Sequence, residues 1–140
     1  MTTSDNLRRY AIDAPTLLLL VTDDVSVRDD VRLVAPHSIR SDALSALLQR
    51  AQADGIADAE VRRLHTRMTE LPIRVLGDRV SRWTAYELAR EHGWSSIAAA
   101  EYLAVAKLQA EALVTVDAAM AQCADGIVPV ASLDALRPRA

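Results

Sequence analysis

The chain has 140 residues, a formal net charge of −3 and a hydrophobic content of 51%, which together fit a single globular domain over residues 1–140. The weak negative charge excludes a surface that attracts nucleic acid over its whole extent, and the single cysteine, Cys123, excludes an internal disulfide or a thiolate metal cluster. No early apolar segment has the form of a signal peptide, and the longest apolar run is too short to cross a bilayer, so we expect a cytoplasmic protein without membrane contact.

The first predicted strand, residues 10–12, ends at Asp13. Pro15 follows, and because the first turn of a helix does not use the backbone N–H that proline lacks, we expect a helix over residues 16–22. An acidic stretch then separates this helix from a second short strand at residues 31–34. The opening third of the chain therefore predicts a strand, a helix and a strand.

Two helices are predicted in the middle of the chain. The first is capped by Ser38 or Ser41 and ends near Ala51. The second begins at Asp58, which we expect to be its N-cap, and ends near Glu70. Apolar residues recur at helical spacing in both helices: Leu44, Leu47, Leu48, Val61, Leu64, Met68 and Leu71.

A third strand is predicted at residues 73–76, after a proline that separates it from the preceding helix. The next helix begins at Asp78 and ends at Gly93, because an aspartate favours a helix start and a glycine a helix end. We expect its inward face to carry Val80, Trp83, Thr84 and Leu88.

The last part of the chain predicts a helix over residues 97–109, a fourth strand at 112–116, a short helix at 118–123 and a last strand at 127–130. Strands and helices therefore alternate throughout. That alternation is typical of an α/β fold in which helices cover both faces of a parallel sheet.

Two of the predicted strands end in aspartate, at Asp13 and at Asp117. In a parallel sheet both residues fall on the same edge, and ligands bind in the crevice beyond the carboxyl ends of the strands. Either residue alone is also explained as a helix N-cap. A third acid, Asp42, lies near the start of a helix, where its charge suits the helix dipole and a structural role suffices.

Glu101 is an acid within an apolar pattern. At the spacing of an ideal helix it shares one stripe with Ile97, Ala104, Val105 and Leu108. We expect this acid to be buried or to lie at the wall of a crevice, and a buried carboxylate needs a cation or hydrogen-bond donors to compensate its lost hydration. The alternative is a glutamate that reaches out to solvent or bonds a nearby tyrosine or arginine.

Acids without a nearby lysine favour a hard divalent cation, because Mg²⁺ and Mn²⁺ prefer carboxylate and water ligands. Such an ion can orient a phosphodiester and activate water. Arginines can bind a polyanion, because the guanidinium is a planar fork that matches phosphate. The candidate ligands are Asp13, Asp42, Glu101 and Asp117.

Other chemistries fit less well. The three histidines have no paired spacing for a zinc site, and the four glycines form no phosphate-binding loop. The apolar run that ends at Asp23 and Asp24 imitates the acidic pair of a phosphoacceptor receiver domain. The strand at residues 73–76 ends without the aspartate that such a domain needs, so we disfavour it.

Several stretches, in order, resemble a PIN domain. They are Tyr10-Ala-Ile-Asp13-Ala, Val34-Ala-Pro36 followed by Asp42 and Ala-Leu-Ser-Ala-Leu-Leu, Leu71-Pro-Ile-Arg-Val75, Ala100-Glu-Tyr-Leu-Ala-Val-Ala106 and Ala112-Leu-Val-Thr-Val-Asp117. The resemblance covers nearly the whole chain. It implies a three-layer α/β/α sandwich with the first strand central, and a Mg²⁺- or Mn²⁺-dependent ribonuclease similar to VapC-type toxins, which dimerise and are silenced by a cognate antitoxin.

Carried over by position, the resemblance assigns the first, second and fourth family acids to Asp13, Asp42 and Asp117, and the small hydroxyl residue to Thr115. Two positions depart from the family pattern. Ala99 stands where the third acid is usual, with Glu101 two residues later, and Pro15 stands where a serine or threonine is usual, so that one hydroxyl contact is expected to be missing.

These residues lead to two expectations. The first is an endoribonuclease, the toxin of a toxin–antitoxin pair, in which Asp13 and Asp117 hold the metal and Asp42 and Glu101 bind it directly or through water. In that hypothesis the candidate contacts to the RNA backbone are Arg8, Arg9 and Arg40. The second, motivated by Ala99, is a PIN-like protein with a weak or inactive site that acts by binding a partner protein or RNA.

Overall fold

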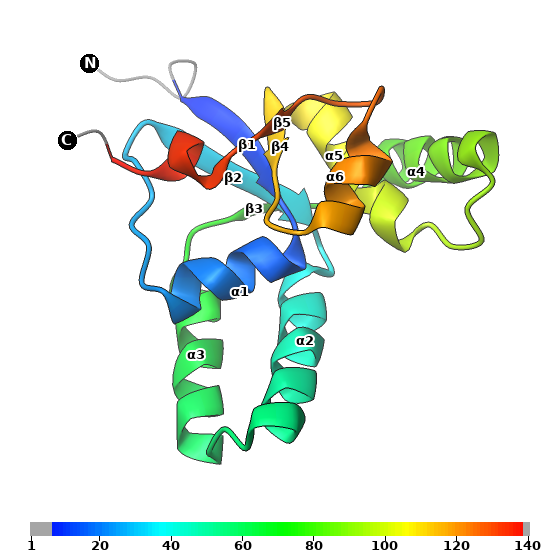
Figure 1. The fold of residues 1–140 in the computed structure, drawn as a ribbon. Coiled ribbons are helices and arrows are strands. Elements are labelled where there is room, and N and C mark those ends of the chain that lie inside the picture. Colours follow the sequence, from blue (N-terminus) through cyan, green and yellow to red (C-terminus); the bar gives the residue numbers. More distant parts are fainter. Residues whose placement is uncertain (1–6, 139–140) are drawn as a thin grey trace.

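A five-stranded parallel sheet forms the centre of the computed structural model, which describes residues 7–138 (Figure 1). The strand order is β3-β2-β1-β4-β5, so the first strand is central, as expected. Register is set by pairs such as Tyr10 with Leu33 on one side of β1 and Ile12 with Val114 on the other. The strands are β1 (Arg8–Ile12), β2 (Val31–Pro36), β3 (Arg74–Leu76), β4 (Ala112–Val114) and β5 (Val130–Ala131).

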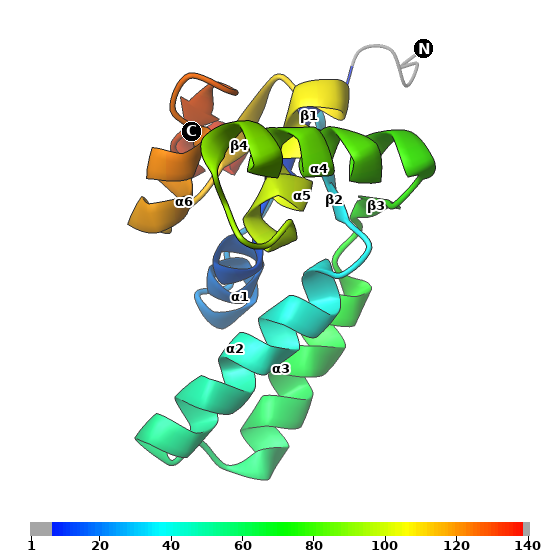
Figure 2. The same cartoon turned by 90° about the vertical axis from the view of Figure 1, so that its right-hand side faces the viewer.

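Helices cover both faces of the sheet, which confirms the three-layer α/β/α sandwich (Figures 1 and 2). Because side chains alternate along a strand, β1 sends Tyr10 and Ile12 to one core and Ala11 to the other. The first core contains residues of α1 and of the α2–α3 pair, and the second contains residues of α4, α5 and α6. The helices are α1 (Ala14–Thr22), α2 (Ile39–Asp54), α3 (Asp58–Glu70), α4 (Arg79–His92), α5 (Ala98–Gln109), α6 (Ala118–Ala124) and the 3₁₀ helix η2 (Leu133–Leu136).

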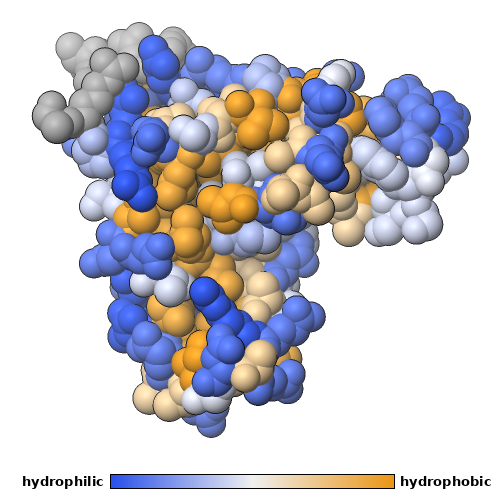
Figure 3. All heavy atoms as spheres, viewed as in Figure 1, coloured by the Kyte–Doolittle hydropathy of each residue, from blue (hydrophilic) through white to orange (hydrophobic). Residues whose placement is uncertain are grey.

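The α2–α3 pair forms an antiparallel hairpin that extends away from the sheet in both views (Figures 1 and 2). Gly55 ends α2 with a φ of 69°, a left-handed conformation that favours glycine. Asp58 is the first residue of α3 and Ala57 is its N-cap, so the expected capping role of Asp58 is wrong. On the face shown in Figure 3, hydrophobic residues gather around α1, in the middle of the molecule.

The inward face of α4 differs from the expectation. Trp83 and Val80 are each 57% exposed, although we expected them to be buried. The residues that α4 buries are Ser81, Ala85, Leu88 and Ala89, so only Leu88 of the expected set is in the core. Small side chains let α4 pack closely on α5, and that packing turns the larger residues outward.

In the last third of the chain, the observed strand boundaries differ from the predicted ones. Strand β4 ends at Val114, two residues early, and β5 lies at Val130–Ala131, after most of the expected stretch at residues 127–130. The 3₁₀ helix η2 was not predicted, and its Leu136 is fully buried. None of the helices described over residues 7–138 combines the length and the apolar character needed to span a bilayer.

Candidate functional site

Asp13 follows the carboxyl end of the central strand and is only 1% exposed. It is the N-cap of α1, because its Oδ1 accepts hydrogen bonds from the Thr16 N–H at 3.2 Å and from the Thr16 hydroxyl. Its Oδ2 accepts a bond from the Thr115 hydroxyl at 2.5 Å. The hydroxyl contact that the sequence led us to expect missing at Pro15 is therefore made by Thr16, one residue later.

The two threonines link Asp13 to the loop after β4. The Thr16 hydroxyl accepts a bond from the Val116 N–H at 3.1 Å, and the Thr115 hydroxyl accepts one from the Asp117 N–H at 3.0 Å. Each hydroxyl thus donates its proton to the carboxylate and accepts a hydrogen bond from a backbone N–H. This network fixes the position of the Asp13 carboxylate, since any rotation would break bonds to two different elements.

Asp117 follows β4, the strand that neighbours β1. Ile12 of β1 pairs with Val114 of β4, so Asp13 and Thr115 are next to each other beyond the strand ends. Asp117 is half-buried and caps α6, with its Oδ1 accepting a bond from the Ala119 N–H at 3.3 Å. The structure therefore places both strand-terminal aspartates at the same edge of the sheet.

Asp42 is held by a long-range contact that the sequence did not predict. Its Oδ2 accepts a bond from the Tyr102 hydroxyl at 2.7 Å and one from the Ser38 hydroxyl at 3.1 Å. Tyr102 belongs to α5 and is only 6% exposed, whereas Asp42 lies on the exposed first turn of α2. The phenol thus ties the start of α2 to the helix that covers the sheet.

The pKa of Tyr102 is raised well above its ordinary value. Burial is the largest cause, and the hydrogen bond to Asp42 is the next, because both oppose ionisation of the phenol. The negative charge of Asp13 raises the pKa further. Asp13 and Asp42 therefore both act electrostatically on this one hydroxyl, and both favour the protonated phenol that donates the hydrogen bond.

Glu101 is half-buried in the first turn of α5. The stripe assigned to it is buried only in part, because Ala104 and Val105 are in the core whereas Ile97 is 36% and Leu108 is 43% exposed. Among residues 7–138 it makes no side-chain hydrogen bond or ion pair, so the alternative of a bond to tyrosine or arginine is not observed either. Glu101 is therefore half-buried beside the core and not within it, and the side chain of Ala99 supplies no ligand atom.

The three candidate RNA-contact arginines lie apart from Asp13. Arg40 donates to the backbone carbonyls of Met68 and Leu71, each at 3.0 Å, and so fastens α2 to the end of α3. Arg8 and Arg9 open strand β1 and lie at the amino edge of the sheet, whereas Asp13 follows its carboxyl end. The structure does not bring these side chains to the aspartates.

The donor atoms of the candidate residues decide which cation the site could hold. The candidate side chains offer only carboxylate oxygens, which suits Mg²⁺ or Mn²⁺. Within residues 7–138, no three His, Cys, Asp or Glu side chains are grouped closely enough to hold a metal ion. Mg²⁺ is commonly held by one or two carboxylates, with water and substrate phosphate completing its shell, so two carboxylates at one edge of the sheet, Asp13 and Asp117, fit that mode.

Comparisons with known proteins bear on the fold alone. No protein-family model matches the chain, and no curated protein matches its sequence. The fold is similar to the crystal structure of PAE2754 from Pyrobaculum aerophilum, with a TM-score of 0.69 over 91% of this chain and 92% of that one. The two chains are 22% identical, so this likeness carries no information about activity.

Proposed function

We propose that this chain is a Mg²⁺- or Mn²⁺-dependent endoribonuclease of the PIN type, the toxin component of a toxin–antitoxin pair. The observation that supports the proposal best is the environment of Asp13. Capping α1 needs only one oxygen of that carboxylate, yet its other oxygen is bonded by Thr115, which lies in the loop after β4. A buried acid fixed from two sides at the carboxyl edge of a parallel sheet is suited to holding a ligand.

In this proposal Asp13 and Asp117 hold the ion, and Asp42 and Glu101 bind it directly or through water. When bound, the ion would supply charge neutralisation and activation of water at a phosphodiester. The hydroxyls of Thr16 and Thr115 keep the Asp13 carboxylate in one rotamer, so that little reorganisation accompanies binding.

Tyr102 orients the carboxylate of Asp42, as the two threonines orient that of Asp13. By donating to one oxygen of Asp42, it leaves the other carboxylate oxygen without a bond from residues 7–138. A carboxylate oriented in this way can accept a proton or a water ligand on its free side.

Cleavage of single-stranded RNA in Mn²⁺ tests the proposal. Asp13→Asn keeps an oxygen that can cap α1 but removes the charge, so we expect cleavage to fall by more than the roughly 10- to 100-fold typical of residues that only support a ligand. Asp78→Asn is the matched control, because Asp78 caps α4 through a bond from the Ser81 N–H at 2.8 Å in the same arrangement. Cleavage that survives in Asp13→Asn, or falls equally in both variants, would contradict the proposal.

A second candidate is a PIN-like protein that acts by binding a partner without catalysis. It is favoured by the lack of a three-acid group within residues 7–138 and by Ala99 at the usual third-acid position. Calorimetric titration with Mn²⁺ separates the two. The nuclease should bind Mn²⁺, with Glu101→Gln weakening the binding, whereas the inactive protein should release no heat of binding.

Both candidates involve protein partners. The toxin would bind a cognate antitoxin and form a homodimer. A groove of about 540 Å³ along the α2–α3 hairpin supports a protein partner, since it has an apolar lining that includes Leu44, Leu48 and Val61, and Leu48 is 55% exposed. Sedimentation of the purified chain, alone and with its antitoxin, measures both associations.

A further inference from the structure

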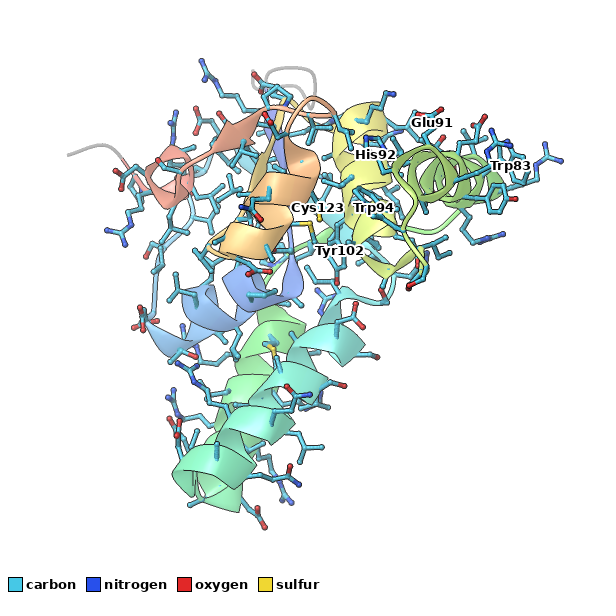
Figure 4. The ribbon with its side chains drawn as sticks, turned by 45° about the vertical axis from the view of Figure 1, so that its right-hand side comes forward. Trp83, Glu91, His92, Trp94, Tyr102 and Cys123 are labelled. Carbon is cyan, nitrogen blue, oxygen red and sulfur yellow. The ribbon has the colours of Figure 1, made fainter. Side chains whose placement is uncertain are left out.

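The outer face of α4 carries two aromatic rings in contact with solvent. Trp83 is 57% and Tyr86 is 44% exposed, and the two rings are stacked with centroids 4.8 Å apart and planes inclined by 20°. Figure 4 shows Trp83 on the side of α4 that points away from the sheet. Large aromatic residues in such a position do not contribute to the core, and a contiguous exposed pair of them is typical of a surface that binds a ligand or partner.

The positive and negative side chains of α4 lie on opposite sides of Trp83. At roughly 100° per residue, the three arginines of α4 and Tyr86 fall to one side of Trp83, and the two glutamates, Glu87 and Glu91, fall to the other. The ion pairs formed within residues 7–138 involve none of these arginines. We call the first side, with Trp83 itself, the α4 stripe, and its members are Arg79, Arg82, Trp83, Tyr86 and Arg90.

A hollow continues the α4 stripe toward the start of α5. Its volume is about 290 Å³, and Tyr86, Trp94 and Arg90 line it together with the hydroxyl-bearing Ser95 and Ser96. The Arg90 guanidinium carbon lies 5.8 Å from the centroid of the Tyr86 ring, in the range of a cation–π contact. Aromatic walls, a cation and hydroxyl groups are the parts that hold an unstacked base and its phosphate.

We propose that the α4 stripe and this hollow bind a single-stranded segment of RNA, one base stacking on Trp83 and another entering the hollow between Tyr86 and Trp94. The choice of RNA rests on the proposed function. The arginines of the stripe pair with phosphates, and the phosphates follow the arginine side of Trp83 because Glu87, which lines a hollow with Trp83 and Arg79, lies on its other side. The hollow ends at the residues that lead into α5, whose first turn carries Glu101, so a strand bound here runs toward the candidate site.

Anisotropy of a labelled oligouridylate of about 12 nucleotides, titrated in EDTA, tests this surface without cleavage or metal. We expect Trp83→Ala to weaken binding by about 5- to 100-fold, since one stacked base is lost, and Trp83→Phe to restore most of it. Arg90→Ala should lower the slope of log affinity against log salt by about 0.7. Val130→Ala, at a side chain 44% exposed on β5, is the control and should leave binding unchanged.

A direct readout comes from fluorescence, because the chain has two tryptophans. In a Trp94→Phe variant the emission belongs to Trp83 alone, and stacking of a base should quench it. Thermal unfolding of each variant shows whether the fold is retained, as we expect for a side chain as exposed as that of Trp83.

The outcomes separate this inference from the proposed function. Affinity that is the same in Trp83→Ala and in the unaltered chain overturns the RNA surface, whatever the nuclease assay shows. A dimer that Trp83→Ala converts to a monomer, with RNA affinity unchanged, identifies an interface between two copies and also overturns it. Binding through Trp83 without any metal-dependent cleavage supports the surface and overturns the nuclease.

Discussion

Thr16→Val is the substitution that most directly probes the network around Asp13. Valine has nearly the same shape as threonine, so the fully buried site keeps its packing and loses only the hydroxyl. Two hydrogen bonds disappear: the donation to the Asp13 carboxylate and the acceptance of the Val116 N–H at 3.1 Å. A bond to a charged group contributes about 1.5–3 kcal/mol and a neutral one about 0.5–1.5 kcal/mol, so we expect a loss of about 2–4 kcal/mol in the free energy of unfolding.

Thr16→Ser is the matched control, because it keeps the hydroxyl and removes one buried methyl group. That deletion costs about 1 kcal/mol from lost burial and incomplete collapse of the site. Urea unfolding followed by circular dichroism measures both variants. An unchanged m-value assures that only stability has changed. In a domain of this size we expect a drop in Tm of roughly 10 °C for valine and about 3–4 °C for serine.

The order of the two variants decides the interpretation. If the methyl group of Thr16 were the important part, valine would be neutral or stabilising and serine would be the worse substitution. That order, or a loss below about 1 kcal/mol for Thr16→Val, would refute a network that holds the Asp13 carboxylate through this hydroxyl.

Two further predictions concern hydrogen bonds of single side chains. Tyr102→Phe keeps the buried ring but removes the hydrogen bond to Asp42. We expect urea unfolding to show a loss of about 1 kcal/mol in the free energy of unfolding, because Asp42 is exposed and water replaces the lost donor. An unchanged free energy of unfolding would show that the bond contributes nothing. The pKa of Glu60 is lowered by its hydrogen bond from Arg63, so folding is favoured by this pair above the ordinary carboxyl pKa of 4.5 and loses that contribution as the pH falls through the lower, folded-state value. The Tm difference between the unaltered chain and Glu60→Gln should therefore be positive at neutral pH and fade in acid, and a difference that grows in acid would contradict the assignment.

The sheet and its edge acids were predictable because their signals are local. Short apolar runs ended by Asp13 and Asp117 define two strand ends, and alternation with helices forces the strands to be parallel, which places both acids at one edge. The resemblance also identified Thr115 as a partner of this site, and its hydroxyl bonds Asp13. Local sequence patterns were therefore enough to predict the architecture and the position of Asp13, Thr115 and Asp117.

The remaining features depend on contacts between distant residues. The bond from Tyr102 to Asp42 joins positions 60 residues apart, and no local pattern encodes it. Trp83 faces outward because the alanines of α4 pack against α5, a preference for close approach that hydrophobicity alone does not reveal. Thr16 did carry a usable signal, since it lies three residues after Asp13, where a helix N-cap meets the backbone N–H of the third residue.

Calorimetric titration with Mn²⁺ tests the central claim most directly. If the aspartates beyond β1 and β4 form a cation site, the unaltered chain binds Mn²⁺, Asp13→Asn and Asp117→Asn abolish or strongly weaken that binding, and Asp78→Asn leaves it intact. A chain that binds no Mn²⁺, or one whose affinity is the same in all three variants, would contradict the metal site and the nuclease built on it.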